Sequence, residues 1–499
     1  MKTIIHYLCI LLIAFSFSSC EDFLTEIPQD TYSVDGKYKN QVDFDQAIAG
    51  IYTRNRVLYS STGMYDSWYR YTNVRADDNR PTIGYVYGFD LFTENSLQPE
   101  FLLTGWKTFY QIISFSNLIL DKIDDGEFTD PNMKEYIRGE AYFFRAYAYW
   151  SLCWQFGGVP LYDREVSVDE IRTIPRSTQA ETFDFAIDSY KNAFDRLPEE
   201  WTGSNIGRIT KYAAAGMLAR LYLFRGNFAE AKPYLASIIN SGKYRKEPEY
   251  IDVFSDRYNN GPERVWAIQF AGGNQGHGTS YPSSAFPEQL AIDNPWTPFN
   301  VSHAVHSVSE SLVEAYEPGD LRFDHNLATN AVIAGRVDDR YWNTKFIHWV
   351  TYRPVSASDW AINFAILRYT DVEMMYAEVL NEEGYSPSGD AFRIINEVRA
   401  RAGLAPLDPA VVDNQAKFRD AIKQERRIEF CWEGLRWLDL IRWGDAVQVM
   451  NEFFNRPENP RQGNGQPYEM KPHQVVFQIP FDQLTRYNDE NILWQNPGY

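Results

Sequence analysis

Apolar residues recur at helical spacing along most of this chain, and two long stretches interrupt that pattern. The clearest helical stretch runs from Lys417 to Asp445, where apolar positions follow the helical period on both sides of Gly434. This spacing predicts two helical pieces with a break at the glycine. The same pattern predicts further helices at about 42–58, 105–123, 134–156, 178–197, 209–225, 364–381 and 390–401.

Small residues mark a place where two predicted helices cross closely. Residues 213–216 are small, Gly226 supplies a turn, and residues 229 and 231 are alanines in the following helix. This layout resembles a tetratricopeptide unit, in which two antiparallel helices approach closely. The stretch at 364–401 repeats the layout, with a turn at Gly384. One pair cannot bury its apolar face alone, so we expect a mainly α, helical-repeat scaffold of about four stacked pairs, with 417–445 as its last layer.

Residues 59–100 and 245–362 lack the helical rhythm and are rich in Tyr, Trp, Gly, Asp, Asn and Pro. Alternating positions predict a short strand at 264–270, and a second strand is predicted at 475–479. Loops as long as these are uncommon in a compact domain unless they serve a function. The sequence therefore predicts a helical scaffold that carries a large loop-rich insertion.

Charged residues are threaded through the 417–445 stretch. Glu425, Glu429 and Glu433 step by four and share one helical face, which Arg436 can reach. Paired carboxylates of this kind serve as acid and base in some enzymes. Buried charges are also tolerated where arginines neutralise carboxylates between docked helices, and ion-pair networks occur in ordinary scaffolds. We favour the second interpretation and assign this stretch to the scaffold.

Motifs for cofactor or metal chemistry are weak in this sequence. The glycine-rich segment 271–278 matches neither a phosphate-binding loop nor a dinucleotide fingerprint. His303 and His306 stand three residues apart but have no acidic or cysteine partner at helical spacing, and no CxxC or HExxH spacing occurs. We expect no catalytic residue, no metal ligand and no cofactor, while a structural calcium ion stays open.

Two clusters in the loop-rich regions suit a polyhydroxylated ligand. Carboxylate, amide and guanidinium groups form charge-assisted bonds to hydroxyls, and aromatic faces stack on apolar ring surfaces. The candidate ligand-binding residues are Trp68, Tyr71, Asp77, Asp78, Asn79, Arg80 and Tyr85 in the first cluster, and Trp296, Trp342, Trp349 and Trp360 in the second. The alternative, that most of these aromatic residues pack loops onto the helices, remains open for each of them.

The net charge of −19 argues against nucleic-acid binding and against a polybasic grip on anionic lipid. At the N-terminus, Lys2 precedes an apolar run that is too short to span a bilayer and suits a signal peptide at 1–19. Small residues before Cys20 resemble a lipobox, although Phe17 departs from the usual leucine. We expect Cys20 to be diacylated and to hold a tether at 20–40 on a membrane. Cys153 and Cys431 are predicted to be buried free thiols.

Five segments of the chain form a set that is specific to one family: ERRIEFCWEGLRWLDLIRWGD at 425–445, LRYTDVEMMYAEVLNE at 367–382, IRGEAYFFRAYAYWSLCWQFGGVPL at 137–161, QNPGY at 495–499 and SSCEDFLTEIPQ at 18–29. These segments resemble the SusD/RagB family of surface nutrient-binding lipoproteins of Bacteroidetes. The resemblance implies one SusD-like domain at 41–499, with a ligand face built from the loop-rich regions and a helical face toward a partner transporter. Glu21 and Asp22 resemble the acidic tag that directs such lipoproteins to the outer-membrane surface.

The resemblance implies a non-enzymatic glycan-binding lipoprotein that acts as a lid over a SusC-like TonB-dependent transporter and delivers oligosaccharide to it. A second hypothesis changes the ligand class, because RagB-like members capture peptides. A third is a glycoside hydrolase with two facing carboxylates. The sequence favours the first hypothesis, and the particular ligand stays open.

Overall fold

The computed structural model describes residues 37–60, 72–80, 88–93, 99–284, 307–333, 336–347 and 351–499. Within these ranges most regular structure is helical, which confirms the mainly α prediction. The longer helices are α2 (Gln41–Val57), α4 (Pro99–Lys122), α5 (Pro131–Phe156), α7 (Gln179–Arg196), α8 (Lys211–Phe224), α9 (Phe228–Asn240), α13 (Tyr369–Glu383), α14 (Asp390–Arg401), α15 (Gln415–Glu429) and α17 (Ala446–Asn455). Shorter ones are α6 (Val168–Ile171), α11 (Glu310–Ala315), α12 (Leu321–Asn326), α16 (Arg436–Trp443) and α18 (Phe481–Tyr487).

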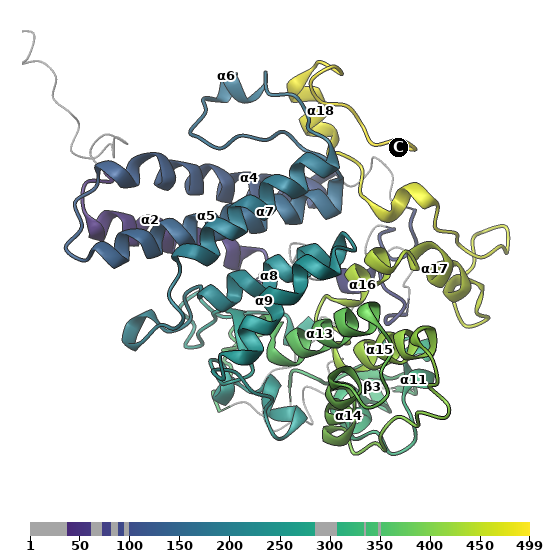
Figure 1. Ribbon diagram of the computed structural model, residues 1–499. Helices are drawn as coiled ribbons and strands as arrows, with labels where there is room; N and C mark the ends of the chain where they lie inside the picture. Colours follow the sequence, from purple (N-terminus) through teal and green to yellow (C-terminus); the bar gives the residue numbers. More distant parts are fainter. Residues whose placement is uncertain are drawn as a thin grey trace, which may run out of the picture.

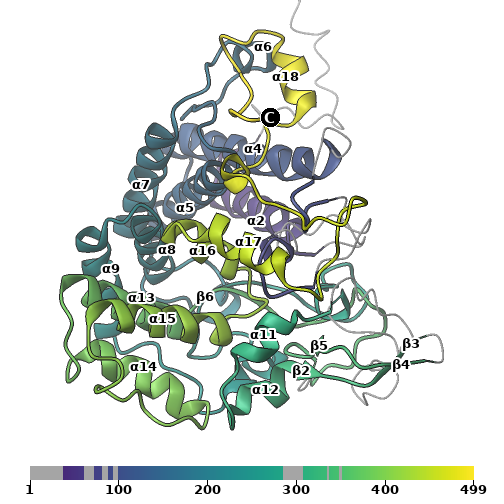
Figure 2. The ribbon, with the colours of Figure 1, turned by 90° about the vertical axis from the view of Figure 1, so that its right-hand side faces the viewer.

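The helices pack as a continuous series of neighbours. Helix α2 packs on α4, α5 on α7, α8 on α9 and α13 on α14, and α4 with α5, α7 with α8 and α9 with α13 join these pairs into one stack (Figures 1 and 2). Helix α15 lies against α13 and α14. The described residues therefore form the predicted tetratricopeptide-like stack, with α15 as a further layer.

Local sequence explains where these helices begin. Asn40 and Asp43 form a capping box at the start of α2, and Thr178 with Glu181 forms another at the start of α7. Helix α5 starts with Asp130 as its cap and Pro131 in the first turn, where proline is well tolerated. These caps satisfy backbone N–H groups that have no partner within the helix.

The strands of the described residues are short. Strand β1 (Arg264–Ile268), which the sequence predicts, pairs antiparallel with β6 (Phe364–Arg368). Two further two-stranded sheets join β2 (Leu327–Ala328) to β5 (Trp342–Asn343) and β3 (Ala331–Ile333) to β4 (Arg336–Asp338). The helix predicted at 364–381 therefore begins only at residue 369, because the apolar run that precedes it fits a buried strand equally well.

The predicted strand at 475–479 is wrong. Residues 472–475 form a short 3₁₀ turn, and the chain then runs extended without a partner strand. Phe477 donates its backbone N–H to the Gln155 carbonyl, and Ile479 donates to the side chain of Gln495. The alternating burial of residues 475–479 thus comes from packing against α5 and the C-terminal tail. This packing produces the two-residue period of a strand, although no neighbouring strand forms ladder hydrogen bonds with the segment.

The main hydrophobic core draws on both ends of the chain. It includes Phe44 in α2, nearly all of α8, and Leu493 close to the C-terminus. Cys153 and Cys431 are buried free thiols, as predicted. Burial raises the pKa of Cys431 to about 11, which keeps this thiol protonated and unreactive at neutral pH.

The described chain starts at a fixed point on the scaffold. Gln41 donates its backbone N–H to the Glu127 carbonyl at 2.9 Å, and Glu127 donates to the Lys39 carbonyl at 2.8 Å. These bonds join the entry to α2 to the connection between α4 and α5. Cys20, the predicted signal peptide and residues 20–36 of the predicted tether lie outside the described residues. None of the described helices combines the length and the apolar character needed to cross a bilayer.

Candidate ligand-binding site

The candidate ligand-binding face is the loop-rich side, and its described residues show how the loops are attached. Where the first loop region leaves α2, the Tyr59 carbonyl accepts a hydrogen bond from the Thr279 hydroxyl at 3.1 Å. Tyr59 also stacks on Phe364 of β6. Thr279 lies within the second loop region and precedes the segment that carries Trp296, so the start of the first loop region is joined to the second at this point.

The far ends of the same loops also meet. Arg80 donates its backbone N–H to the Ser307 carbonyl at 2.8 Å, and Ser309 donates to the Asp78 carbonyl at 3.0 Å. Val308 in turn donates to the Tyr341 carbonyl at 2.9 Å. The structure therefore brings together the attachment points of segments that are more than two hundred residues apart in sequence.

A third piece of this face is held by two carboxylates. Asp359 accepts hydrogen bonds from the Tyr352 hydroxyl at 2.5 Å and from the Asn274 backbone N–H at 2.7 Å. Asp256 accepts from the Thr351 backbone and hydroxyl at 2.6 and 2.8 Å. A Cβ atom on Gly272 would lie 2.1 Å from the Tyr352 ring, so only glycine allows this close approach. The glycine-rich segment is thus a tight loop docked on residues 351–359.

Sequence reasoning did not single out Asp256, Tyr352 or Asp359 as parts of this framework. A lone carboxylate in a loop carries no periodic signal, and its partners come from distant segments. The glycine-rich run was the visible sign that two backbones approach closely here.

Five of the aromatic candidates, Trp68, Tyr71, Tyr85, Trp296 and Trp349, lie outside the described residues, as do His303 and His306. Trp342 and Trp360 are described, and both are buried. Trp360 is 0% exposed, and its Nε1 donates to the Ser283 hydroxyl at 2.7 Å. Trp342 is 4% exposed and has the Arg340 guanidinium over its ring. These two tryptophans are packed in the interior, which is the alternative that the sequence left open for each aromatic candidate.

The predicted hydrogen-bonding cluster at 77–80 is also turned inward. Asp77 accepts from Arg436 at 2.8 Å and pairs with Arg427 at 2.9 Å, and Arg427 also binds Asp78 at 2.9 Å. Asn79 accepts from the indole Nε1 of Trp432 at 3.0 Å, and Arg80 pairs with Glu310 at 2.9 Å. The cluster therefore clamps this loop onto the turn between α15 and α16.

The charges of this clamp are strongly coupled. Burial alone would raise the pKa of Asp77, but Arg427 and Arg436 outweigh it and hold that pKa below its usual value. Burial, together with the Asp77 charge, raises the pKa of Asp78 against the effect of Arg427. Asp77 therefore provides the charge that both arginines need in the interior.

We expect Asp77→Asn to lower the free energy of unfolding by about 3 kcal/mol, because it leaves two largely buried arginines short of a carboxylate. Chemical denaturation followed by circular dichroism measures the loss. Asp482→Asn, which changes a partly exposed carboxylate paired with Arg486, is the matched control and should change stability by less than about 1 kcal/mol. Equal stability of the two variants would contradict the assignment of Asp77 to the scaffold.

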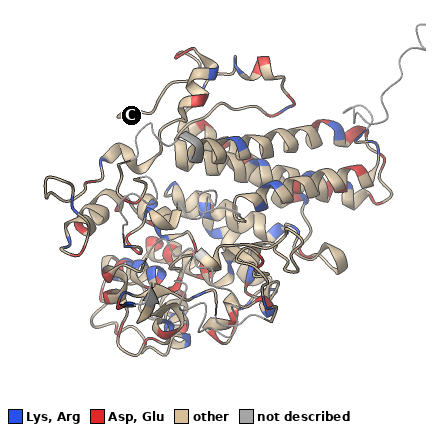
Figure 3. Ribbon diagram, turned by 180° about the vertical axis from the view of Figure 1, so that it is seen from behind, with Lys and Arg blue, Asp and Glu red and all other residues tan. Residues whose placement is uncertain are grey.

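The carboxylates of α15 are likewise committed to buried cations. Arg368 binds Glu263 at 2.6 Å, Glu433 at 2.7 Å and Glu429 at 3.1 Å. Arg401 binds Glu263 and Glu429 at 2.9 and 2.7 Å. Basic and acidic residues are interspersed in this part of the molecule (Figure 3). The described geometry therefore supports the scaffold interpretation of the 417–445 stretch.

The network continues on both sides of α15. Further buried pairs are Arg322 with Asp320 and Glu425, Lys345 with Glu433, Arg426 with Asp371 and Asp439, and Arg442 with Glu378 and Asp439. Lys345 also donates to the Glu429 and Cys431 carbonyls at 2.9 and 3.0 Å, fixing the end of the helix. Among the described residues, no group of three or more His, Cys, Asp or Glu side chains is arranged to hold a metal ion.

Comparison with known proteins identifies relatives of this chain. The profile of the SusD family matches residues 314–499, and a profile described as starch-binding associating with outer membrane matches residues 22–223. The chain belongs to the SusD-like family. Helix α15 and the turn that follows it fall within the first match, and the stack from α2 through nearly all of α8 falls within the second.

SusD-like relatives extend over nearly the whole chain. A SusD-like protein of Formosa agariphila is 26% identical, covering 94% of both chains, and one of Bacteroides ovatus is 24% identical, covering 89% of this chain and 83% of its own. Among solved structures, surface glycan-binding protein A from Bacteroides fluxus superposes with a TM-score of 0.78 at 22% identity, covering 92% of this chain and 100% of its own. The protein of that name from Bacteroides thetaiotaomicron, in complex with laminarihexaose, gives 0.76 at 19% identity, covering 92% and 100%.

The α15 network predicts how stability depends on pH. Burial acts to raise the pKa of Glu263 and of Asp371, but neighbouring arginines lower both to about 2. A carboxyl whose folded pKa is depressed stabilises the fold above its unfolded pKa and loses that effect as pH falls toward the folded value. Glu425, whose pKa burial raises, acts in the opposite direction.

We therefore expect the free energy of unfolding to fall steadily between about pH 4.5 and pH 2. Urea denaturation at a series of pH values measures the slope. Glu263→Gln should flatten that slope, because this variant has no proton to take up at residue 263. A slope that the substitution leaves unchanged would contradict the role of Glu263.

Proposed function

We propose that this protein is a non-enzymatic glycan-binding lipoprotein of the outer-membrane surface. It captures oligosaccharides on the loop-rich face and delivers them to a SusC-like TonB-dependent transporter, over which it acts as a lid. The observation that carries the ligand-binding part is the meeting of loop ends: Tyr59 beside Thr279, and Arg80 beside Ser307. Segments bearing Trp68, Tyr71, Tyr85 and Trp296 are therefore attached around one region of the surface.

The names of the relatives agree with a carbohydrate ligand. One solved SusD-like structure is titled laminarin binding, and another holds laminarihexaose. The profile matched by the N-terminal half is described as starch-binding and as associating with the outer membrane. Acylation of Cys20 would supply the membrane attachment, with two or more acyl chains giving a stable anchor.

The chemistry of the face suits capture followed by release. Aromatic rings stack on the C–H faces of sugars, and a small number of hydrogen bonds fix the hydroxyls. Such sites give affinities of roughly micromolar to millimolar, or about −8 to −4 kcal/mol. A protein that passes its ligand to a transporter needs affinity in this range.

Calorimetric titration with laminarin, starch, other polysaccharides and oligopeptides tests the ligand class. Trp68→Ala and Trp296→Ala should each weaken binding of the recognised glycan by about tenfold, or about 1.4 kcal/mol. Trp494→Ala removes a partly exposed tryptophan that stacks with Arg176, away from this face, and serves as the matched control.

If only peptides bind, the loop-rich face would be assigned to peptide capture. If the protein cleaves a glycan that it binds, the assignment as a transporter lid would give way to assignment as a glycoside hydrolase. Unchanged affinity in both loop variants would overturn the assignment of the site. Cys20→Ser should abolish incorporation of labelled palmitate and release the protein from the membrane fraction, and co-purification tests the transporter.

A further inference from the structure

A polar cavity lies at the seam between the helical stack and the loop-rich insertion. Its volume is about 210 Å³, and it is bounded by the α7–α8 connection, the residues after α9, and strand β1. Trp201, Lys243, Tyr244 and Asn260 lie in its wall. Of the sequence-predicted ligand-binding residues that the structure describes, none lies in this wall.

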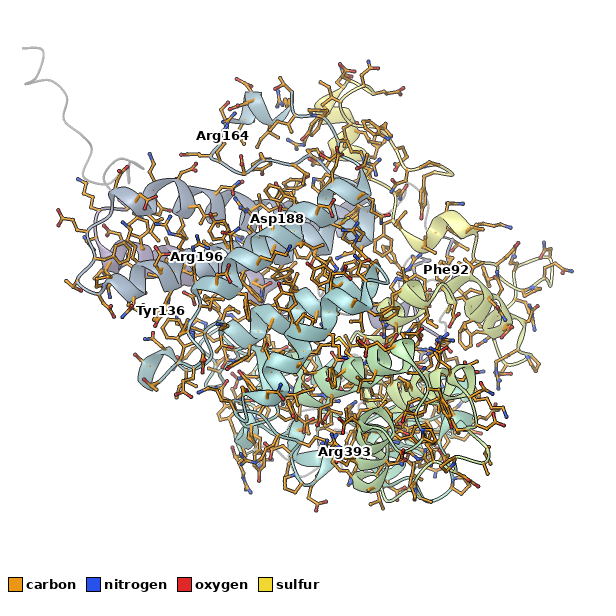
Figure 4. All side chains as sticks on the ribbon, viewed as in Figure 1. Phe92, Tyr136, Arg164, Asp188, Arg196 and Arg393 are labelled. Atoms are coloured by element: carbon orange, nitrogen blue, oxygen red, sulfur yellow. The ribbon has the colours of Figure 1, made fainter. Side chains whose placement is uncertain are left out.

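The aromatic part of the wall is held rigidly. Trp201 donates its indole Nε1 to the Ile209 carbonyl at 2.7 Å, and the Arg208 guanidinium lies 4.6 Å from its ring centroid. Tyr136 of α5 packs edge-on against the same indole, and Figure 4 shows this residue at the end of its helix. Tyr244 stacks with Tyr369 on α13. A wall fixed in this way needs little further ordering when a ligand binds.

The charges around the cavity are compensated. Arg208 is committed to Glu140 and Asp45, so it has little charge to offer an anion. Lys243 pairs with Glu200 at 2.9 Å and lies 3.7 Å from Glu199. An ammonium group has three donors and a carboxylate two acceptor oxygens, so this pair retains hydrogen-bonding capacity after meeting.

Neutral polar groups complete the lining. Asn260 donates to Gln269 at 3.2 Å and keeps its amide oxygen at an exposed position. Half-buried Trp201 and exposed Ile206 add apolar surface beside these groups. Such a combination of fixed apolar walls with a few donors and acceptors is typical of small-molecule sites, and this volume is below the roughly 300–1,000 Å³ of drug-sized ligands.

We propose that this seam cavity binds one neutral sugar ring, as a second saccharide site separate from the loop-rich face. The charged and the neutral groups of the wall include both hydrogen-bond donors and acceptors, which match the vicinal hydroxyls of a sugar. The cavity volume admits a single sugar ring rather than a chain. The ring is either a free monosaccharide or the terminal unit of a longer glycan.

Titration with a panel of neutral methyl glycosides, followed by saturation-transfer NMR, tests the proposal. The background is the double variant Trp68→Ala/Trp296→Ala, which removes the contribution of the loop-rich face. In this background at least one methyl glycoside should still bind, and Asn260→Trp, which fills the cavity from an exposed position, should weaken it by more than tenfold. Lys243→Ala should weaken it by several-fold.

Lys232→Ala is the matched control, because Lys232 is an ion-paired lysine that contacts Glu383 on another part of the stack. It should leave binding unchanged. Tighter binding of the corresponding disaccharide would identify the ligand as a chain end, and equal binding would identify a free monosaccharide. Absence of glycoside binding in the double variant, or equal binding by Asn260→Trp, would overturn the proposal. Failure of the loop-rich site has a different result: long glycans would then bind the double variant as tightly as the unaltered protein.

Discussion

Arg368→Ala is expected to lower the free energy of unfolding by about 3–5 kcal/mol, because it leaves three carboxylates without their shared cation in the protein interior. Arg368 is 1% exposed and binds Glu263, Glu429 and Glu433. Guanidinium denaturation followed by circular dichroism measures the loss.

The control for this prediction is Arg393→Ala on α14. Arg393 also binds two carboxylates, Asp390 and Glu397, but its side chain is 54% exposed and lies at the surface (Figure 4). Exposed pairs contribute about 0–1 kcal/mol, so this variant should stay within about 1 kcal/mol of the unaltered protein. Similar losses in the two variants would show that burial of the α15 network does not set its energetic importance.

Trp360→Ala is expected to be nearly as damaging, with a loss of about 3–5 kcal/mol from the cavity it leaves. Its backbone also pairs with Thr279, whose hydroxyl holds Tyr59, so the substitution loosens the attachment of both loop regions. Thermal denaturation measures the change in stability. The stoichiometry of a glycan titration at low temperature measures the fraction of the variant protein that is folded.

Trp360→Phe separates packing from hydrogen bonding at this position. It keeps most of the ring volume but loses the bond to Ser283, so we expect a smaller loss than for alanine. If Trp360→Ala instead kept full stability and lost glycan affinity, Trp360 would contact ligand, as the sequence first suggested.

Much of the helical scaffold follows from local sequence. The capping boxes at Asn40 and Thr178 and the glycine turns at Gly226 and Gly384 act within a few residues, so the pattern alone locates them. The apolar runs at 364–368 and 475–479 were harder, because short buried segments have no decisive period. The partner of the first run, β1, and the Gln155 carbonyl that binds the second lie far away in sequence, and the second run also binds the side chain of Gln495 in the C-terminal tail.

The candidate site was less predictable because composition does not distinguish a ligand contact from a loop clamp. Asp77 and Trp360 have the residue types expected of a sugar site. The partners of Asp77, however, are Arg427 and Arg436, more than three hundred residues away in sequence. The partner of Trp360 is Ser283. Only the tertiary fold determines whether such groups face inward. The charges of α15 were interpreted correctly because buried carboxylates at helical spacing need cations wherever they lie.

The paired attachment points also bear on how such a protein diversifies. Where a loop leaves and re-enters a rigid frame at fixed neighbouring positions, doubling its length costs only about 0.6 kcal/mol of closure entropy. Insertions, deletions and exchanges between Ser60 and Thr72, or between Ser284 and Ser307, are therefore separated energetically from the core that supports them, because the buried residues 72–79 and 279–283 stay in place. Selection can replace the recognition surface while the frame persists, which makes these junctions natural boundaries for transplanting specificity from one relative to another.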